Sequence, residues 1–183
     1  MGNKNTTFTE EELEDYEDLT YLTRREILVA WGKWKGLVGG QGEPDRVTRY
    51  PEEDVQKLPE LQHNPFRERI TRVFSSLKDS RMSFEDFLDL LSVMSSKAPL
   101  QLKAHYAFHI FDYNEDQVLD TEDLEVVVER LTGDHALLPE EKSKLVEKLL
   151  EDTDLDGGGI SEEEFKHLLT KCPDFTHSFR FSV

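Results

Sequence analysis

The sequence predicts an all-α protein built from repeated helix-loop-helix units. Apolar residues recur at the i, i+3 and i+4 spacing of an amphipathic helix in segment after segment, and no stretch shows the alternation of a half-buried strand. Phe87, Leu124 and Phe165 each follow an acidic residue after a polar loop, at intervals of 37 and 41 residues. A period of this size is typical of duplicated helix-loop-helix units.

Start signals and apolar stripes locate the helices in order. Capping-box spacing occurs at Thr9 with Glu12 and at Thr23 with Glu26. Asn64 and Pro65 suit the N-cap and first position of a later helix. The apolar faces expected from there on are Phe66, Ile70, Val73 and Phe74; Phe84, Phe87, Leu88, Leu91 and Met94; Ala104, Ala107, Phe108 and Phe111; Leu124, Val127, Val128 and Leu131; Leu145, Val146, Leu149 and Leu150; and Phe165, Leu168 and Leu169.

Composition excludes several functions. The 183 residues include 39 acidic and 22 basic side chains, for a formal net charge of −17, and a chain this acidic without a basic stripe is a poor nucleic-acid binder. No apolar run of about 18 residues suggests a membrane span, and we expect a cytoplasmic protein. Neither a nucleophile-base pair nor catalytic metal spacing is visible, so we expect no enzyme.

The strongest motif is the acidic segment 112–123, which lies between two amphipathic helices. Ca²⁺ prefers six to eight oxygen ligands, and a 12-residue loop of this kind supplies them from positions 1, 3, 5, 7, 9 and 12. These positions hold Asp112, Asn114, Asp116, the Val118 carbonyl, Asp120 and Asp123. Leu119, at position 8, is the apolar residue that joins paired loops. The segment therefore predicts an EF-hand ion site.

Two departures from the usual pattern modify this prediction. Gln117 stands at position 6, where Gly usually makes the sharp turn, and a non-glycine residue at positive φ costs on the order of 1 kcal/mol. Asp123 stands at position 12, where the longer Glu is usual. Both changes favour weaker Ca²⁺ binding or the smaller Mg²⁺.

A second acidic segment, residues 152–164, allows two registers. A loop that starts at Asp152 has good ligand spacing but turns charged residues toward the core, whereas a loop that starts at Asp154 keeps the apolar faces inward and is one residue short. Helix burial is worth several kcal/mol, so we favour the second register. Asp154, Asp156 and Glu164 are then the expected ligands of an irregular fourth loop.

The two earlier units are expected to hold no ion. With Met82 aligned to position 8, the second loop has Ser75, Leu77 and Asp79 at positions 1, 3 and 5 and Asp86 at position 12, which is too few carboxylates for a divalent ion. The stretch 36–50 has no ordered ligand series. We therefore predict four EF-hand units in two lobes with helical extensions at both ends: an N-terminal extension (1–22), an N-lobe (23–98), a C-lobe (99–171) and a C-terminal tail (172–183).

Two smaller patterns remain. His105 and His109 are spaced i, i+4, but Tyr106 follows the first of them, so the zinc-protease motif H-E-x-x-H is absent and surface helix positions are expected. The N-terminal MGNKNT fits myristoylation of Gly2. One such chain gives marginal, reversible membrane binding, so a membrane-protein partner would have to add a second attachment.

The whole sequence resembles the calcium- and integrin-binding protein family. The resemblance rests on MGNK at the start and on residues 16–23 (YEDLTYLT), 58–74 (LPELQHNPFRERITRVF), 84–93 (FEDFLDLLSV), 105–112 (HYAFHIFD) and 173–179 (PDFTHSF). It implies an adaptor at the plasma membrane whose third and fourth EF-hands bind Ca²⁺ or Mg²⁺. Implied partners are integrin α-subunit cytoplasmic tails, channel-like membrane proteins and some kinases.

We expect ion binding to shape an apolar groove in the C-lobe that takes an amphipathic partner helix. The candidate groove residues are Val127, Leu131, Val146, Leu149, Leu150, Phe165, Leu168 and Leu169. Phe175 and Phe179 could fold as a short helix into this groove and be displaced by the partner. The alternative is a calcium buffer with little conformational response.

Overall fold

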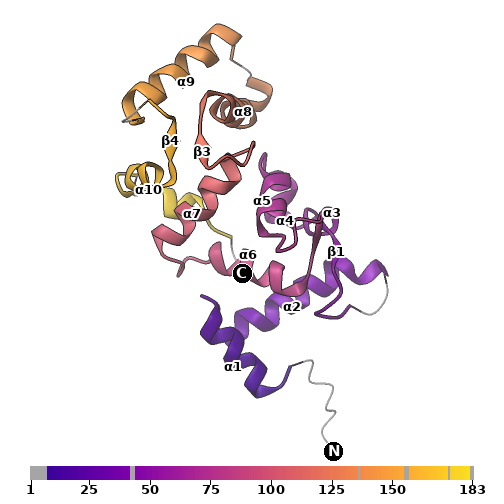
Figure 1. Cartoon of the computed structure of the whole chain (residues 1–183). Helices are drawn as coiled ribbons and strands as arrows, with labels where there is room; N and C mark the ends of the chain where they lie inside the picture. Colours follow the sequence, from indigo (N-terminus) through magenta and orange to yellow (C-terminus); the bar gives the residue numbers. More distant parts are fainter. Residues whose placement is uncertain (1–7, 42–43, 136, 155–156, 173, 182–183) are drawn as a thin grey trace, which may run out of the picture.

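The computed structural model describes residues 8–41, 44–135, 137–154, 157–172 and 174–181. It is mostly helical, with two short two-stranded ribbons, which confirms the all-α EF-hand prediction. The helices fall into two groups that lie end to end (Figure 1). Among the described residues, no helix is both long enough and apolar enough to cross a membrane.

The first group of helices surrounds an aromatic core. It comprises α1 (Glu10–Leu19), α2 (Arg24–Val38), α3 (Glu52–Val55), α4 (Pro59–Gln62), α5 (Arg67–Phe74) and α6 (Phe84–Val93). Trp31 and Trp34 pack against Phe84, which is fully buried, and Phe87 packs against Trp34. β1 (Tyr50–Pro51) pairs with β2 (Arg81–Met82), and Tyr50 faces Met82.

The start signals of these helices are largely confirmed. Thr9 with Glu12 and Thr23 with Glu26 form reciprocal capping boxes at α1 and α2. The predicted start at Asn64 and Pro65 was wrong by two residues, because Phe66 is the N-cap of α5. The Asn64 side chain accepts a hydrogen bond from the Phe66 amide at 2.8 Å and so stabilises a turn before the helix.

The second group contains the acidic loops. It comprises α7 (Leu100–Phe111), α8 (Thr121–Thr132), α9 (Pro139–Thr153) and α10 (Glu162–Thr170), with β3 (Val118–Leu119) paired to β4 (Ile160–Ser161). Phe108, Leu119, Leu124, Val146 and Ile160 form its buried centre. The β3–β4 ribbon holds the two loops side by side, since Leu119 faces Ile160.

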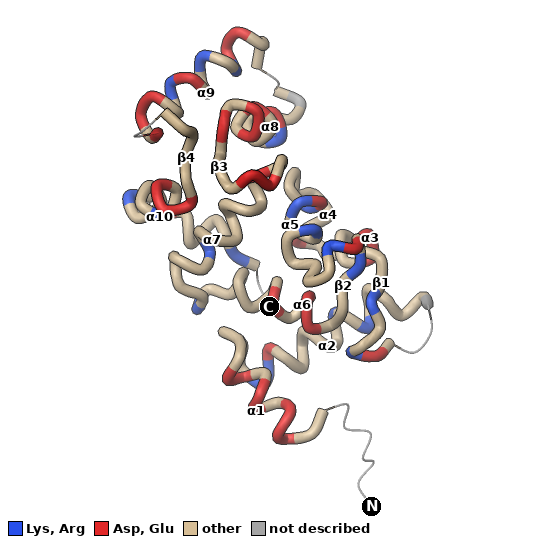
Figure 2. Tube along the Cα trace, in the orientation of Figure 1, with Lys and Arg blue, Asp and Glu red and all other residues tan. Residues whose placement is uncertain are grey.

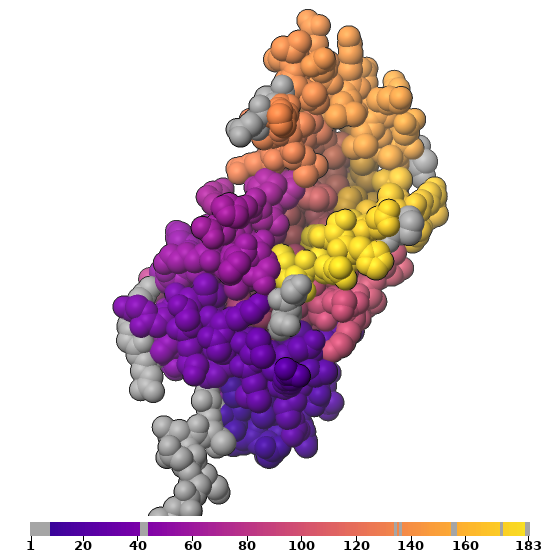
Figure 3. Space-filling view, turned by 180° about the vertical axis from the view of Figure 1, so that it is seen from behind, coloured from indigo at the N-terminus to yellow at the C-terminus, as the bar shows by residue number. Residues whose placement is uncertain are grey.

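The C-terminal segment crosses the junction between the two groups. After the short helix α11 (Phe175–Ser178), the Phe181 amide donates to the Met94 carbonyl at 2.9 Å, and Lys103 Nζ donates to the Phe179 carbonyl at 2.6 Å. The yellow segment lies against both the purple and the orange halves in Figure 3. The tail is therefore packed against the rest of the structure as far as Phe181.

Candidate metal centre

Loop 3, residues 112–123, brings three carboxylates together between α7 and α8. Asp112 is the C-cap of α7 and Asp123 lies in the first turn of α8, and both side chains are almost completely buried. Carboxylate oxygens of Asp112, Asp116 and Asp123 all lie within 4.8 Å of one another. Three converging carboxylates repel one another without a cation, so this donor set fits a hard divalent ion.

Backbone amides hold these carboxylates in place. The two oxygens of Asp112 accept hydrogen bonds from the amides of Asp116 and Gln117 at 3.2 and 3.1 Å, and Asp123 Oδ1 accepts one from Tyr113 at 2.7 Å. Asp120 caps α8 through the amides of Glu122 and Asp123. Burial raises the pKa of Asp123, although the hydrogen bonds that its carboxylate accepts from backbone amides act to lower that pKa. The loop is thus pre-shaped by its own backbone.

The remaining predicted ligands lie on the same loop. Asn114 Oδ1 accepts a hydrogen bond from the Asp116 amide, and Val118 belongs to β3. Gln117 has φ of 73°, the positive value expected for its position, and Glu115 has φ of 60°, which the sequence did not indicate. Two non-glycine residues in this conformation store strain in the loop.

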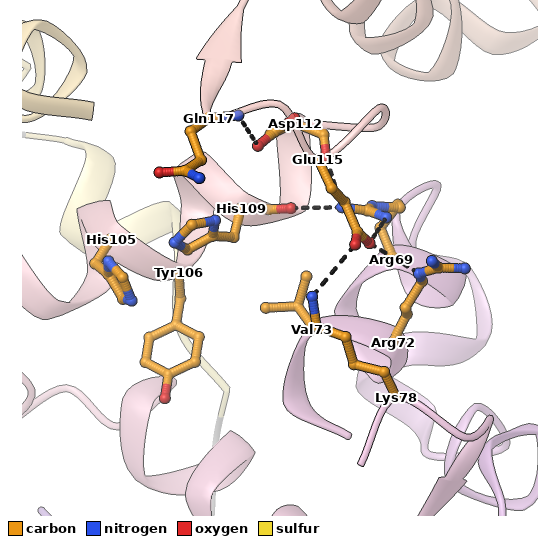
Figure 4. Close-up of a pocket in the computed structure, with 10 residues that line it drawn as sticks. All are labelled: Arg69, Arg72, Val73, Lys78, His105, Tyr106, His109, Asp112, Glu115 and Gln117. Atoms are coloured by element: carbon orange, nitrogen blue, oxygen red, sulfur yellow. Dashed lines mark hydrogen bonds and ion pairs between the residues drawn. The ribbon is translucent and has the colours of Figure 1, made fainter. Parts of the chain in front are cut away.

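Glu115 ties loop 3 to the other half of the molecule. Its carboxylate contacts Arg69 at 3.1 Å, Arg72 at 3.0 Å and Lys78 at 3.2 Å (Figure 4). Partial burial works to raise the pKa of Glu115, but hydrogen bonds from these three cations outweigh it and hold that pKa at about 2. In Figure 2 the red segment that follows α7 lies beside the blue residues of α5.

Arg69 strengthens this connection. Its side chain is buried and also donates to the carbonyls of His109 at 2.7 Å and Asp112 at 2.5 Å, at the C-terminal end of α7. A guanidinium there satisfies carbonyls that the helix leaves unpaired and complements its dipole. Sequence reasoning missed this contact, because Arg69 and loop 3 are joined only in the folded chain.

The fourth loop follows the register that starts at Asp154. Asp154 is the C-cap of α9, as Asp112 is of α7, and its oxygens accept from the amides of Gly157 and Gly159 at 2.8 and 2.9 Å. Glu164 lies in the first turn of α10 and accepts from the Ser161 amide at 2.9 Å. Asp156 lies outside the described residues.

The missing residue of the fourth loop can be located. Gly157 and Gly159 have φ of 83° and 88°, which matches positions 4 and 6 of loop 3, and the next residue, Ile160, pairs with Leu119 at position 8. The deletion therefore falls at position 7, which supplies a backbone carbonyl ligand in a standard loop. A Cβ on Gly159 would lie 2.4 Å from Val118 Cγ1, so only glycine fits there.

The second loop, residues 75–86, holds a cation of its own. Arg49, next to β1, reaches across it and contacts Asp79 Oδ1 and Asp86 Oδ2, each at 2.8 Å. It also contacts Ser75 Oγ at 3.1 Å and the Arg81 carbonyl at 2.6 Å. These groups stand at positions 1, 5, 7 and 12, so a guanidinium takes the place of an ion.

The eight predicted groove residues do not share one surface. Val146 and Val127 are buried in the cores, and Leu150, Phe165 and Leu168 pack partly against the C-lobe core. Leu131 and Leu149 are exposed, and Leu169 is half-buried. The apolar faces of these helices pack inside their own lobe. Few of the eight side chains are therefore available to a partner.

An apolar groove exists elsewhere, under the C-terminal segment. We call it the tail-covered groove, and it is lined by Phe66, Ile70, Met94, Ile110, Phe111 and Leu131, with Phe175, Phe179 and Phe181 of the tail over it. Its remaining cavity measures about 240 Å³. Of the eight predicted residues, Leu131 lines this groove.

Paired loops, flanking helices and converging carboxylates define an EF-hand protein. Residues 101–170 match the EF-hand domain pair family. The chain is 42% identical to human calcium and integrin-binding family member 3 over 188 residues. It is 40% identical to member 2 of that family from Drosophila melanogaster over 195 residues and from Danio rerio over 190. Each alignment covers the whole of both chains.

The chain therefore belongs to the calcium and integrin-binding family, as the resemblance predicted. Its members are calcium-binding EF-hand regulators rather than enzymes, which confirms the expectation drawn from the sequence.

Proposed function

We propose that this chain is an ion-regulated adaptor. It takes up Ca²⁺ in loop 3, and more weakly in the fourth loop, and binds an amphipathic helix from the cytoplasmic tail of a membrane protein. The observation that carries the proposal is the tail-covered groove, an apolar surface at the junction of the two lobes that a short aromatic segment of the chain itself occupies.

The contacts of this segment suggest a replaceable occupant. Phe175 and Phe179 stack at 5.3 Å and lie half-exposed. Two hydrogen bonds hold the segment: the Phe181 amide donates to the Met94 carbonyl, and Lys103 Nζ donates to the Phe179 carbonyl. A partner helix with apolar residues at i, i+3 and i+4 would bury the same groove more completely. The proposed groove residues are accordingly Phe66, Ile70, Met94, Ile110, Phe111 and Leu131, in place of the C-lobe set.

The ion preference follows from the ligands. Loop 3 offers Asp112, Asp116, Asp120 and Asp123 together with Asn114 and the Val118 carbonyl, which suits Ca²⁺. The short Asp123 at position 12 also suits the smaller coordination shell of Mg²⁺, so we propose that Mg²⁺ occupies the loop when Ca²⁺ is scarce. Asp154, Asp156 and Glu164 form the weaker site, because the deletion removes the position-7 carbonyl.

The partner class is proposed from the family. The relatives are named for integrin binding, so an integrin α-subunit cytoplasmic tail is the first partner to test. Channel-like membrane proteins and kinases are further candidates. Such a partner, together with myristoylation of Gly2, would place the protein reversibly at the cytoplasmic face of the plasma membrane. Gly2 lies outside the described residues.

Peptide calorimetry on three chains tests the adaptor role: the full chain, a chain lacking residues 173–183 and full-length Phe179→Ala. With Ca²⁺ present, removal of the segment should strengthen binding of an integrin α-tail peptide about tenfold, since about 1.4 kcal/mol of competing contacts disappears. Phe179→Ala should show part of this gain, and the exposed control His177→Ala should show none. Unchanged or weaker affinity of the truncated chain would contradict displacement.

A hydrophobic-dye titration separates the adaptor from a calcium buffer. An adaptor should expose apolar surface when Ca²⁺ is added, and its dye fluorescence should rise more in the chain that lacks residues 173–183. A buffer would give almost no ion-dependent rise in either chain.

A further inference from the structure

Two histidines and a glutamate converge on the C-lobe, away from loop 3. His105 and His109 lie one turn apart on α7, with ring centroids 4.6 Å apart, and Glu162 begins α10. One ligand atom from each of the three side chains lies within 4.8 Å of the other two. His105 Nδ1 is 2.7 Å from Glu162 Oε1.

These donors differ in kind from the loop ligands. Imidazole nitrogen is a preferred ligand of Zn²⁺ and a poor one for Ca²⁺ and Mg²⁺, which take oxygen. Histidines at i, i+4 lie on one face of a helix and can chelate one ion. Two such nitrogens with one carboxylate give three protein ligands of a tetrahedral site, and water supplies the fourth.

The cluster is accessible to an ion from solvent. His105 and His109 line a cavity of about 430 Å³ between the lobes, with Arg69, Arg72 and Lys78 on its opposite side (Figure 4). Both histidines are half-buried.

A cation of the chain itself competes with a metal ion for the Glu162 carboxylate. Lys166 contacts Glu162 Oε1 at 2.7 Å, and His105 contacts the same oxygen. A metal can therefore use the second carboxylate oxygen while Lys166 keeps its contact. The pairing of His105 with Glu162 already holds α7 against α10, so little rearrangement is needed to bring the ligands to bonding distance.

We propose that His105, His109 and Glu162 form a Zn²⁺ site that is separate from the EF-hand loops and joins α7 to α10. α7 is the first helix of the third helix-loop-helix unit, and α10 is the last helix of the fourth. A bound Zn²⁺ therefore adds a second link between the two units besides the β3–β4 ribbon. Occupancy stabilises the C-lobe without using a loop ligand.

Zn²⁺ calorimetry on the full chain tests this site. The titration is done with saturating Ca²⁺, so that the loops are filled, and in a Cys172→Ser background, so that the exposed thiol cannot bind the metal. We expect one Zn²⁺ per chain. His105→Gln, His109→Gln and Glu162→Gln should each weaken it at least tenfold, because each removes one of three ligands.

The matched control is His167→Gln, which changes an exposed histidine on α10 and should leave Zn²⁺ affinity unchanged. Each variant is also titrated with Ca²⁺, and an unchanged Ca²⁺ isotherm shows that the fold and loop 3 are intact. Co²⁺ bound in place of Zn²⁺ should give the visible absorption of a tetrahedral site in the control and lose it in His109→Gln. Absence of Zn²⁺ binding, or binding that survives His109→Gln, would overturn the proposal.

Discussion

The second loop (loop 2) and loop 3 share one geometry but differ in whether a cationic side chain of the protein lies among their ligand positions. In both, position 1 is the C-cap of the entering helix, positions 4 and 6 have positive φ, and the residue at position 8 joins a β ribbon. The carboxylate at position 12 accepts amide bonds from positions 2 and 9 in each loop: Asp86 from Ser76 and Ser83, Asp123 from Tyr113 and Asp120.

The difference lies in where the positive charge comes from. Loop 2 receives a guanidinium from Arg49, which is attached to the chain and never leaves. Loop 3 presents its buried carboxylates for an ion from solution. The same loop geometry therefore forms an internal link in one half of the molecule and, in the function proposed above, an ion-dependent switch in the other.

The largest effect is expected from Arg49→Ala. It leaves the buried Asp86 without its cation, and breaking a buried pair in this way costs about 3 kcal/mol of unfolding free energy. Arg24→Ala is the matched control, because Arg24 likewise contacts several carboxylates, Glu10, Glu14 and Glu17, but at the surface, where the loss should stay below about 1 kcal/mol. Chemical denaturation measures both. Equal losses of unfolding free energy in Arg49→Ala and Arg24→Ala would mean that Arg49 does not replace an ion.

The fully buried Lys103 differs from Arg49, because it donates to the Phe179 carbonyl and not to a carboxylate. Burial, with a smaller contribution from Arg180, lowers its pKa from 10.5 to about 8. Between these values the unfolded chain binds more protons than the folded one, so stability rises with pH.

The measurable consequence is a pH-dependent difference from Lys103→Met. From pH 7 to 10 the wild type should gain about 2 kcal/mol of unfolding free energy relative to this variant, because each tenfold change in proton affinity is worth about 1.4 kcal/mol. Other groups titrate equally in both chains. If the unfolding free energies of the wild type and Lys103→Met change in parallel across this pH range, burial does not lower the pKa of Lys103.

A smaller effect is expected from Asp123→Glu in loop 3. The longer side chain reaches an ion with both oxygens, which favours Ca²⁺ over the smaller Mg²⁺. Ca²⁺ affinity should rise about tenfold, or about 1.4 kcal/mol, while Mg²⁺ affinity stays level or falls. Calorimetry with each ion separates the two. An equal rise in affinity for both ions would mean that side-chain length at position 12 does not determine the preference for Ca²⁺ over Mg²⁺.

Much of this arrangement could be predicted from local sequence. Alternating polar ligands between two apolar stripes define loop 3, and the pairing of Met82 with Tyr50 agrees with its alignment at position 8. The register of the fourth loop could be chosen because the free energy gained by burying Leu150 and Phe165 exceeds the cost of a loop that is one residue short. These features depend on spacing within one unit.

Contacts between units could not be predicted in this way. Arg49 lies 30 or more residues from the carboxylates that it joins, and Glu162 lies more than 50 from the histidines that it meets. A signal for Arg49 existed: an arginine directly before the ribbon residue Tyr50, opposite a loop poor in carboxylates. The predicted groove does not include α5, because the sequence of an amphipathic helix shows an apolar face without showing which segment covers it.

We propose that loop 3 is the principal ion site and that loop 2 takes up no ion. Ca²⁺ calorimetry on wild type, Asp112→Ala and Asp79→Ala tests this proposal most directly, with circular dichroism to check the fold. Asp112→Ala should remove the tighter site and leave at most the weaker fourth loop. Asp79→Ala should leave Ca²⁺ affinity and stoichiometry as in the wild type. An unchanged isotherm for Asp112→Ala would mean that loop 3 is not the principal site, and a lost site for Asp79→Ala would mean that loop 2 binds an ion.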